Sequence, residues 1–417
     1  MQTVRTETPQ QDSMLSETGI PEAASAGRFD AIIIGASVAG CICALYLANK
    51  GWRVLVLEQR ALFSHYKRIC THILHPYAVQ TLQSLGLFGT LRDTSALPTF
   101  MRIHYQQHTL HFPFGAKATA ANIERRDLDP LLREALATHP RISLQLGSHI
   151  KHIESQQSGN RVFHTAHNEP QINSTGTLIL ADGRASNSAW QLGAKRRRQP
   201  NGRVALFAYV RLDSHRVDKV ASDVWSLDQG AQYLALFPNR SRALVSWYMP
   251  DRDFDKIQQS KDTHFDARID TIRSEFPHLG ERVSAVMVAK DTSPVSARLP
   301  FSASRCGVFM VGDAKLAADP LTGVGCAWAM RSARLLAACL GDPPVTAESI
   351  SHHAAHRLSR VLLYRSLHWL SFAVPSYVMT LASKHGHWIF NSPVFRTLSF
   401  LSRPKRSQSA KVNSMAR

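Results

Sequence analysis

Two short runs near the start of the chain, residues 29–34 and 53–57, are rich in isoleucine, valine and leucine. Neither run alternates with polar residues, a pattern typical of parallel strands that are buried on both faces. Residues 41–50 between them are mostly small and apolar and end at Gly51, which predicts a helix joining the two strands. The pattern predicts a strand–helix–strand unit, and with it an α/β fold whose N-terminal domain is Rossmann-like.

The hydrophobic pattern changes in the middle of the chain, where residues 200–292 lose helical periodicity. Strands are predicted at residues 204–212, 233–237 and 242–248, with a turn at 238–241. The expected architecture is therefore α+β overall, with an antiparallel β-sheet domain inserted into the Rossmann-like domain. We expect a flexible leader at 1–27, a dinucleotide-binding domain at 28–195 and 293–345 with a strand excursion near 96–118, a sheet domain at 196–292, and a C-terminal helical region with a basic tail at 346–417.

The first predicted strand runs straight into a turn with the sequence Gly35-Ala36-Ser37-Val38-Ala39-Gly40. Gly35 permits the tight turn, Gly40 permits close packing of helix and strand, and the helix N-terminus offers free N–H groups to a pyrophosphate. Ser37 departs from the usual pattern, in which a glycine stands at this position. Glu58 ends the second strand, where a carboxylate hydrogen-bonds ribose hydroxyls and repels a 2′-phosphate. The unit predicts a site for FAD or NAD rather than NADP.

Three later segments, at residues 124–132, 178–183 and 307–314, follow the glycine turn in a recognisable order. Together they resemble the FAD-dependent monooxygenases of the p-hydroxybenzoate hydroxylase type and the geranylgeranyl-reductase-like oxidoreductases that share their fold. The resemblance covers roughly residues 29–345. It implies a bound FAD, NAD(P)H as co-substrate and a sheet domain that binds the substrate.

The first two of these segments supply three cofactor-binding candidates through the resemblance. In the family, an arginine of the first segment approaches the flavin side of the site; here it is Arg125, with Arg126 as a close alternative. Asp182 and Gly183 match a turn motif whose aspartate is linked to FAD and NAD(P)H binding. By itself this motif is equally interpretable as an ordinary turn after a strand.

The third segment ends in Gly312 and Asp313, which match a family motif whose aspartate contacts the ribityl or ribose hydroxyls of FAD. Seven residues further on, Pro320, Gly323 and Gly325 match a loop whose backbone amides face the isoalloxazine ring. A predicted helix of small residues follows this loop. The resemblance therefore implies that this part of the chain holds the flavin end of the cofactor.

Residues 69–76 and 82–87 resemble a stretch of bacterial oxidoreductases in the same superfamily, T-H-x-x-H-P followed by L-x-x-x-G-L. His72 and His75 of this stretch are candidate catalytic residues, because an imidazole near a flavin relays a proton or hydrogen-bonds a substrate carbonyl. Each is also interpretable as a structural loop histidine. We find no catalytic triad and expect no metal site, since flavin chemistry requires neither.

Aromatic side chains of the predicted sheet domain are candidates for a substrate pocket over the flavin: Phe207, Tyr209, Tyr233, Phe237 and Trp247. Their character favours an apolar or aromatic substrate. Strand alternation puts Phe207 and Tyr209 on one face and Trp247 opposite to Tyr248, so only one subset can face the flavin. Residues 245–250 also faintly resemble a flavin-dependent halogenase motif, but the first tryptophan of that motif is missing.

Composition bounds the partners and the compartment. Lys and Arg number 49 against 31 Asp and Glu, a net charge of +18, yet no nucleic-acid-binding signature accompanies the basic clusters at 195–198 and 403–406. We expect these clusters to be solvated loops and tail, and expect no nucleic-acid partner. Six cysteines in 417 residues are too few for a disulfide framework and lack zinc-type spacing, which fits a reducing cytoplasm.

Beyond residue 349 the chain has a helical pattern and is basic and rich in histidine. The stretch at 366–382 has no charged residue, but it is too short for a membrane span and contains Pro375. Three interpretations remain for this region: a helical cap on the catalytic domain, a dimer contact, or a peripheral contact with an anionic membrane that delivers a lipophilic substrate.

The expected function is that of an FAD-dependent monooxygenase of secondary metabolism. NAD(P)H and O2 would hydroxylate or epoxidise a small lipophilic or aromatic compound through a C4a-hydroperoxyflavin. The alternative is a geranylgeranyl-reductase-like flavoenzyme that reduces or dehydrogenates C=C bonds of a lipophilic substrate. A third interpretation, a flavin-binding sensor or assembly factor, predicts bound FAD that neither NADH nor NADPH reduces.

Overall fold

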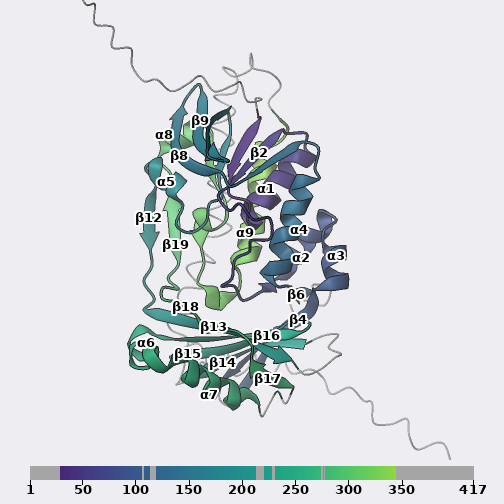
Figure 1. The fold of residues 1–417 in the computed structure, drawn as a ribbon, viewed down its shortest axis with the longest axis vertical. Helices are drawn as coiled ribbons and strands as arrows, with labels where there is room; N and C mark the ends of the chain where they lie inside the picture. The colour runs from purple at the N-terminus through teal and green to yellow at the C-terminus, as the bar shows by residue number, and fades with distance from the viewer. Residues whose placement is uncertain are drawn as a thin grey trace, which may run out of the picture.

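The computed structural model describes residues 29–105, 108–112, 119–212, 220–227, 231–273, 276 and 278–343. The predicted leader at 1–27, the predicted C-terminal helical region at 346–417 and its basic cluster at 403–406 lie outside the described residues. In the described part, a parallel sheet with its helices stands on a large and mostly antiparallel sheet (Figure 1).

The parallel sheet is built on the predicted strand–helix–strand unit. Its five strands are, in spatial order, β20 (Val308–Met310), β11 (Leu178–Leu180), β1 (Ala31–Ile34), β2 (Val54–Glu58) and β7 (Ile142–Leu146). In the central strand β1, Ile32 and Ile34 pack on one face, whereas Ala31 and Ile33 pack on the other. Burial on both faces explains why this strand shows no polar alternation.

Helices cover one face of the parallel sheet and further strands cover the other. The helical layer contains α1 (Val38–Asn49), α4 (Arg125–Ala137) and α9 (Gly325–Leu340), with α2 (Pro76–Ser84) beside α9 and α3 (Phe88–Thr94) beside α2. The opposite layer contains the antiparallel strands β8 (His149–Gln156), β9 (Gly159–Ala166) and β10 (Glu169–Thr175), with α5 (Asn187–Gln191) and α8 (Phe301–Arg305). No helix among the described residues is long and apolar enough to cross a membrane.

The large sheet has ten strands and contains the three strands predicted for the middle of the chain. Along its main path lie β17 (Leu279–Arg282), β13 (Arg203–Leu212), β16 (Arg242–Pro250), β15 (Gln232–Pro238), β14 (Val220–Leu227), β4 (Leu97–Tyr105), β6 (Ala120–Asn122) and β3 (Ile73–Leu74), with β18 (Met287–Ala289) beside β13 and β5 (His108–Phe112) beside β4. Strand β4 pairs in parallel with β14. The predicted strand excursion is thus an integral part of this sheet, which extends beyond residues 196–292.

Two helices lie in a region for which the sequence pattern predicted only strands. These are α6 (Asp251–Ile257) and α7 (Lys261–Arg273), joined by a short 3-10 turn (Gln258–Ser260), and they cover the face of the large sheet that points away from the parallel sheet (Figure 1). The expectation of an all-strand region was therefore wrong. In α7, Phe265, Ile269 and Ile272 form a buried stripe at helical spacing, but charged neighbours on the remaining positions obscure it in the sequence.

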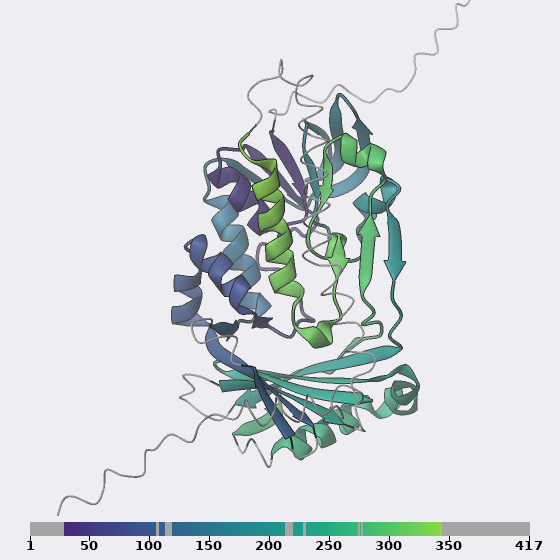
Figure 2. The same ribbon diagram turned by 180° about the vertical axis from the view of Figure 1, so that it is seen from behind.

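Strands β12 (Lys195–Arg198) and β19 (Val295–Arg298) pair antiparallel and run between the two parts of the molecule, with β21 (Leu316–Ala317) beside β19 (Figures 1 and 2). The basic cluster at 195–198 is therefore a strand rather than a loop, although its four side chains are exposed as expected. These two strands carry the chain from one part to the other and back.

Candidate cofactor and substrate site

A cleft lies where the carboxyl ends of β1, β11 and β20 meet the N-terminal ends of α1 and α9. It spans about 800 Å³ of empty space, part of which is open to solvent. In open α/β sheets, ligands bind in a crevice at the carboxyl ends of the strands. Seven of the predicted cofactor residues line the cleft: Ser37, Arg125, Gly183, Asp313, Pro320, Gly323 and Gly325.

The N-terminal ends of α1 and α9 both face the cleft and are both uncapped. Ser37 precedes α1 and Val324 precedes α9, and neither side chain caps its helix. Neither helix has an acidic residue in its first turn. Free backbone N–H groups and the positive ends of two helix dipoles therefore point at one cavity, an arrangement suited to an anionic ligand such as a pyrophosphate.

The predicted glycines shape this cleft through close backbone contacts. Gly35 has a φ of +105°, and a Cβ on Gly40 would lie only 1.8 Å from the Gly35 carbonyl oxygen. Gly312 has a φ of +58°, and a Cβ there would lie 2.5 Å from the Cβ of Ala39. These positions let α1 lie directly against the ends of β1 and β20.

Glu58 stands at the end of β2, beside the glycine turn. One of its carboxylate oxygens accepts a hydrogen bond from the Ala36 N–H at 2.7 Å, and the other accepts one from the Arg60 N–H at 2.9 Å. The carboxylate is thus held against the first turn of the predicted dinucleotide site. Contact of Glu58 with a ribose stays a prediction.

Arg125 is the arginine of the predicted pair that lines the cleft. Its guanidinium is buried and makes two hydrogen bonds to Asp129, at 2.6 and 3.0 Å, which fix its orientation. Nη2 also donates to Ser37 Oγ at 2.9 Å, and Nη1 donates to Cys326 Sγ at 3.9 Å. Arg125 therefore connects α4 with the N-terminal ends of α1 and α9, whereas the half-exposed Arg126 pairs with Glu124.

Asp313 lies at the edge of the cleft, where the Lys67 ammonium lies 3.2 Å from its carboxylate. The charge of Asp313 raises the pKa of Lys67. Lys67 lies in the loop between β2 and β3 and was not among the predicted site residues, because no motif marks it. It adds a second cation to the cleft beside Arg125.

Asp182 uses both carboxylate oxygens within its own turn. One accepts from Ser186 Oγ at 2.6 Å and the other from the Ser188 N–H at 3.1 Å, at the start of α5. Asp182 thereby shapes the turn that puts Ala181 and Gly183 on the wall of the cleft. A direct contact with the cofactor stays a prediction.

His72 does not line the cleft but lies behind it, with a left-handed φ of 62°. Its Nδ1 accepts a hydrogen bond from the Arg125 N–H at 3.2 Å, so Nε2 carries the proton and donates to Tyr209 Oη at 2.7 Å. Burial lowers the pKa of His72. The histidine therefore joins α4 to the large sheet as a neutral imidazole, and its catalytic role stays a prediction.

The lowered pKa of His72 leads to a prediction about the pH dependence of stability. An unfolded chain, in which histidine has a pKa near 6.5, binds the proton more readily than the folded protein, so stability decreases as the pH falls below about 6.5. His72→Asn removes the titrating group, and asparagine tolerates a positive φ. Between pH 7.5 and 5, we expect the unfolding free energy of the variant to change less steeply than that of wild type, by up to about 1.4 kcal/mol per pH unit.

Urea unfolding at several pH values measures this difference. His149→Asn is the control: because His149 is exposed, this variant should keep the wild-type dependence of the unfolding free energy on pH. Parallel slopes for wild type and His72→Asn would show that His72 is not held neutral by burial.

His75 precedes α2 and packs against the loop before α9. A Cβ on Gly323 would lie 3.6 Å from its Nε2 and 2.7 Å from Cγ2 of Ile73. Burial lowers the pKa of His75, and a hydrogen bond with the Thr322 backbone opposes this effect. His75 thus supports the glycine loop from behind, and its catalytic role also stays a prediction.

Aromatic side chains cover the face of the large sheet that lies nearer the cleft, although none of them lines the cleft itself. Phe207, Tyr209, Tyr233 and Phe237 belong to one buried cluster on that face together with Tyr248. Ile73 belongs to the same cluster and also lines the cleft, and Ile69 lines the cleft beside it. The aromatic face therefore adjoins the cleft through these two isoleucines.

Trp247 lies on the opposite face of the large sheet. It is buried with Phe254 and Phe265 of the helices α6 and α7, and its Nε1 donates to Gln232 at 2.9 Å. Its inclusion among the substrate-pocket residues was therefore wrong, because neighbouring residues of a strand point to opposite faces. Tyr248 takes its place on the cleft side.

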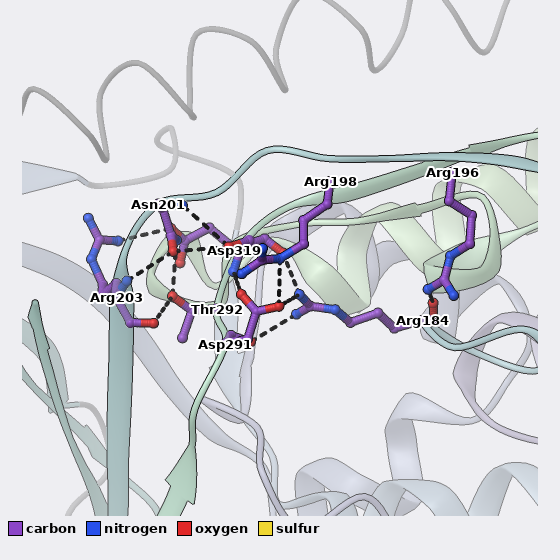
Figure 3. Close-up of polar contacts among 9 residues, drawn as sticks. Arg184, Arg196, Arg198, Asn201, Arg203, Asp291, Thr292 and Asp319 are labelled. Carbon is purple, nitrogen blue, oxygen red and sulfur yellow. Dashed lines mark hydrogen bonds and ion pairs between the residues drawn. The ribbon is translucent and has the colours of Figure 1, made fainter. Parts of the chain in front are cut away.

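A polar network ties the glycine loop to the large sheet. Asp319 accepts hydrogen bonds from Arg203 Nη1 at 2.9 Å and from Asn201 Nδ2 at 3.0 Å (Figure 3). It also accepts one from the Leu321 N–H at 3.0 Å. Arg203 and Asp319 are 8% and 2% exposed, so this ion pair is buried. The loop over the cleft and the first residues of β13 therefore form one rigid connection.

A second part of the polar network joins β12 to the segment that precedes β19. A guanidinium nitrogen of Arg184 and one of Arg198 each lie 3.0 Å from a carboxylate oxygen of Asp291, which precedes β19 (Figure 3). These three side chains are 33%, 55% and 39% exposed. The outer pairs are solvated, in contrast to the buried pair at Asp319.

Comparisons with known proteins agree with this geometry. A family model described as FAD binding domain matches residues 28–356. Menaquinone reductase from Mycolicibacterium smegmatis is 26% identical over 335 residues, which cover 76% of this chain and 78% of that protein. Squalene monooxygenase from Candida glabrata is 32% identical over 98 residues, which cover 23% of this chain and 20% of that protein.

The solved structure of the flavin-dependent brominase Bmp2 aligns with a TM-score of 0.70 and 16% identity, covering 89% of this chain and 94% of that one. At this identity the likeness shows a shared fold. The family match, in contrast, spans most of the sequence and includes every residue that lines the cleft. The chain therefore belongs to the FAD binding domain family and is an FAD-dependent oxidoreductase.

Proposed function

We propose that the protein is a monooxygenase that uses FAD, NAD(P)H and O2 to hydroxylate or epoxidise a small lipophilic or aromatic compound. The observation that carries this proposal is the contact between two unlike surfaces. A cleft with two uncapped helix N-termini and two cations adjoins, through Ile69 and Ile73, an aromatic face of the large sheet. The first surface suits an anionic cofactor and the second an apolar substrate.

The residues of the cleft fit FAD along its length. The N-terminal end of α1 would hold the pyrophosphate, and Glu58 would accept the ribose hydroxyls. Asp313 would accept the ribityl hydroxyls. The loop from Gly323 and the N-terminal end of α9 would face the isoalloxazine ring, where free N–H groups stabilise negative charge on the reduced flavin. FAD supplies hydride acceptance and oxygen activation when bound.

The protein's own residues position and shield the reacting groups. The Asp319–Arg203 ion pair holds the glycine loop against the large sheet, which keeps the substrate face at a constant distance from the cleft. The buried Tyr209, Phe207 and Phe237 exclude water from this face. Exclusion of water protects a reactive oxygen species from breakdown before it meets the substrate.

Asp313→Ala tests the cofactor assignment. The variant loses charge-assisted hydrogen bonds to hydroxyls, worth about 1.5–3 kcal/mol, so we expect FAD to bind roughly 10- to 100-fold more weakly. Quenching of flavin fluorescence during titration of the apoprotein measures this affinity. The matched control is Lys315→Ala, because the Lys315 ammonium bonds to the Ala297 carbonyl at 3.2 Å and lies outside the cleft lining. Equal affinity in both variants would contradict the assignment.

Saturation of C=C bonds is the second candidate function. The menaquinone reductase match, which covers 76% of the chain, supports a reduction of the substrate, whereas the squalene monooxygenase match covers 23%. Both names denote reactions on apolar molecules, which agrees with the aromatic face. The two candidates differ in whether the substrate receives oxygen or hydrogen.

The deciding experiment supplies the holoenzyme with NADPH or NADH and with squalene or a menaquinone as first probes. For a monooxygenase, O2 consumption matches product formation and ¹⁸O from labelled O2 appears in the product. Turnover under anaerobic conditions, with a product that keeps two added hydrogens after reoxidation in air, would contradict oxygenation and support saturation. FAD that neither nicotinamide reduces would contradict both and favour a flavin-binding sensor.

A further inference from the structure

Two cysteines from distant parts of the chain line the same cleft. Cys70 belongs to the loop between β2 and β3, and Cys326 lies in the first turn of α9. The segments that carry them pack against each other, since a Cβ on Gly323 would lie 2.7 Å from Cγ2 of Ile73 and 3.8 Å from Oγ1 of Thr71. Neither thiol takes part in the cofactor contacts or the substrate face described above.

Hydrogen-bond donors and cations surround this pair. Cys70 Sγ accepts from the His72 N–H at 3.5 Å, and Cys326 Sγ accepts from Arg125 Nη1 at 3.9 Å. Lys67 lines the cleft beside them. The neighbouring Cys326 thiol, together with the charges of Arg125 and Lys67, lowers the pKa of Cys70, while the pKa of Cys326 is raised. Such surroundings stabilise a thiolate on Cys70.

The cysteines inside α1 have different surroundings. Cys41 and Cys43 are fully buried, and burial raises the pKa of both thiols. Cys306 and Cys339 are also buried and do not line the cleft. A reactive thiol pair is therefore confined, among the described residues, to Cys70 and Cys326.

We propose that Cys70 and Cys326 form a redox-active pair that exchanges two electrons with the bound flavin. In the oxidised pair, one disulfide bond joins the two sulfurs, which requires them to approach to about 2 Å. This bond accepts two electrons from the anionic reduced flavin and breaks. Cys70 is released as a thiolate beside Arg125, Cys326 takes the proton given up by the flavin, and oxidised flavin remains.

Atoms and charge balance in this step. The reduced flavin anion and the disulfide carry one negative charge and one transferable proton, and so do the oxidised flavin and the thiolate–thiol pair. A disulfide that forms and breaks in turnover agrees with a reducing compartment, where such bonds are transient and catalytic. The inference requires FAD in the cleft, but it goes beyond the proposed function and is independent of oxygenation or saturation.

Electron counting tests the proposal. The holoprotein is treated with the thiol oxidant diamide, freed of reagent and titrated with dithionite under anaerobic conditions. Wild type should take up about twice as many electrons per FAD as Cys70→Ser or Cys326→Ser, because the disulfide accepts a second pair. Cys339→Ser is the matched control, since Cys339 lies on the same helix about 20 Å further along its axis. Equal uptake by wild type and Cys70→Ser would overturn the proposal.

A second measurement on wild type needs no variant and covers the case in which a substitution prevents folding. Alkylation followed by peptide mass spectrometry should find a Cys70–Cys326 linked peptide in the diamide-treated holoprotein and two free thiols after dithionite. Alkylation of both residues in every state would overturn the proposal, as would FAD attached covalently to either one. Absence of FAD from the protein would instead overturn the cofactor assignment, which the flavin spectrum shows separately.

Discussion

Replacing Gly40 with alanine is expected to cost the folded protein about 3 kcal/mol or more and to abolish FAD binding. The added Cβ would lie 1.8 Å from the Gly35 carbonyl oxygen, so the backbone of α1 must move away from the end of β1. That movement displaces the uncapped N-terminus that would hold the pyrophosphate. Urea unfolding of the apoprotein and fluorescence titration with FAD measure the two effects.

Gly89→Ala is the control for this substitution. Gly89 lies in the exposed helix α3, where an added Cβ meets nothing within 4 Å. Alanine favours a helix over glycine, so this variant should be neutral or up to about 1 kcal/mol more stable. A Gly40→Ala protein that matches Gly89→Ala in stability and in FAD affinity would contradict the close packing of helix and strand.

The second large effect is expected at Asp319. Asp319→Ala leaves the Arg203 guanidinium buried without this carboxylate, which costs about 3–5 kcal/mol when one partner of a buried ion pair is removed. The Leu321 N–H at the start of the glycine loop also loses its acceptor. Because this loop lines the cleft, we expect FAD affinity to decrease together with stability.

The neighbouring ion pairs provide the matched control. Asp291→Ala removes a carboxylate from the same network, but its pairs are solvated, and such pairs contribute about 0–1 kcal/mol. Adding Arg203→Met to Asp319→Ala should recover part of the lost stability, because the buried guanidinium that lost this carboxylate is then gone. Similar losses in Asp291→Ala and Asp319→Ala, with no recovery in the double variant, would show that burial of the pair does not matter.

The position of the cleft was predictable because several residues that line it follow directly on motifs in the chain. The turn from Gly35 to Gly40 and the Gly312–Asp313 pair each follow a buried strand directly. In a parallel sheet, the residues that follow the strands meet at one edge. Local motifs therefore indicated the position of the cleft before any tertiary contact was known.

Residues without a motif could not be predicted in this way. Lys67, Cys70 and Cys326 line the cleft, but no spacing in the sequence relates them. The aromatic residues of the sheet were marked by the sequence, but not their orientation. Alternation along the strand put Tyr248 and Trp247 on opposite faces, yet it did not show which face lies nearer the cleft. Helix α7 escaped notice because only three apolar residues mark its buried side.

The order of amino acids is sufficient to establish a dinucleotide-binding α/β domain, an inserted sheet and an FAD site, because these depend on glycines, strand ends and periodicities that lie within a few residues of one another. The folded chain was needed to choose the aromatic face that adjoins the cleft, to pair Asp319 with Arg203 and to bring Cys70 and Cys326 to one cleft. In the two pairs, Asp319 with Arg203 and Cys70 with Cys326, the partners are more than 100 positions apart in the sequence. Only the packing of the parallel sheet on the large sheet, and of α9 beside the loop after β2, brings them together.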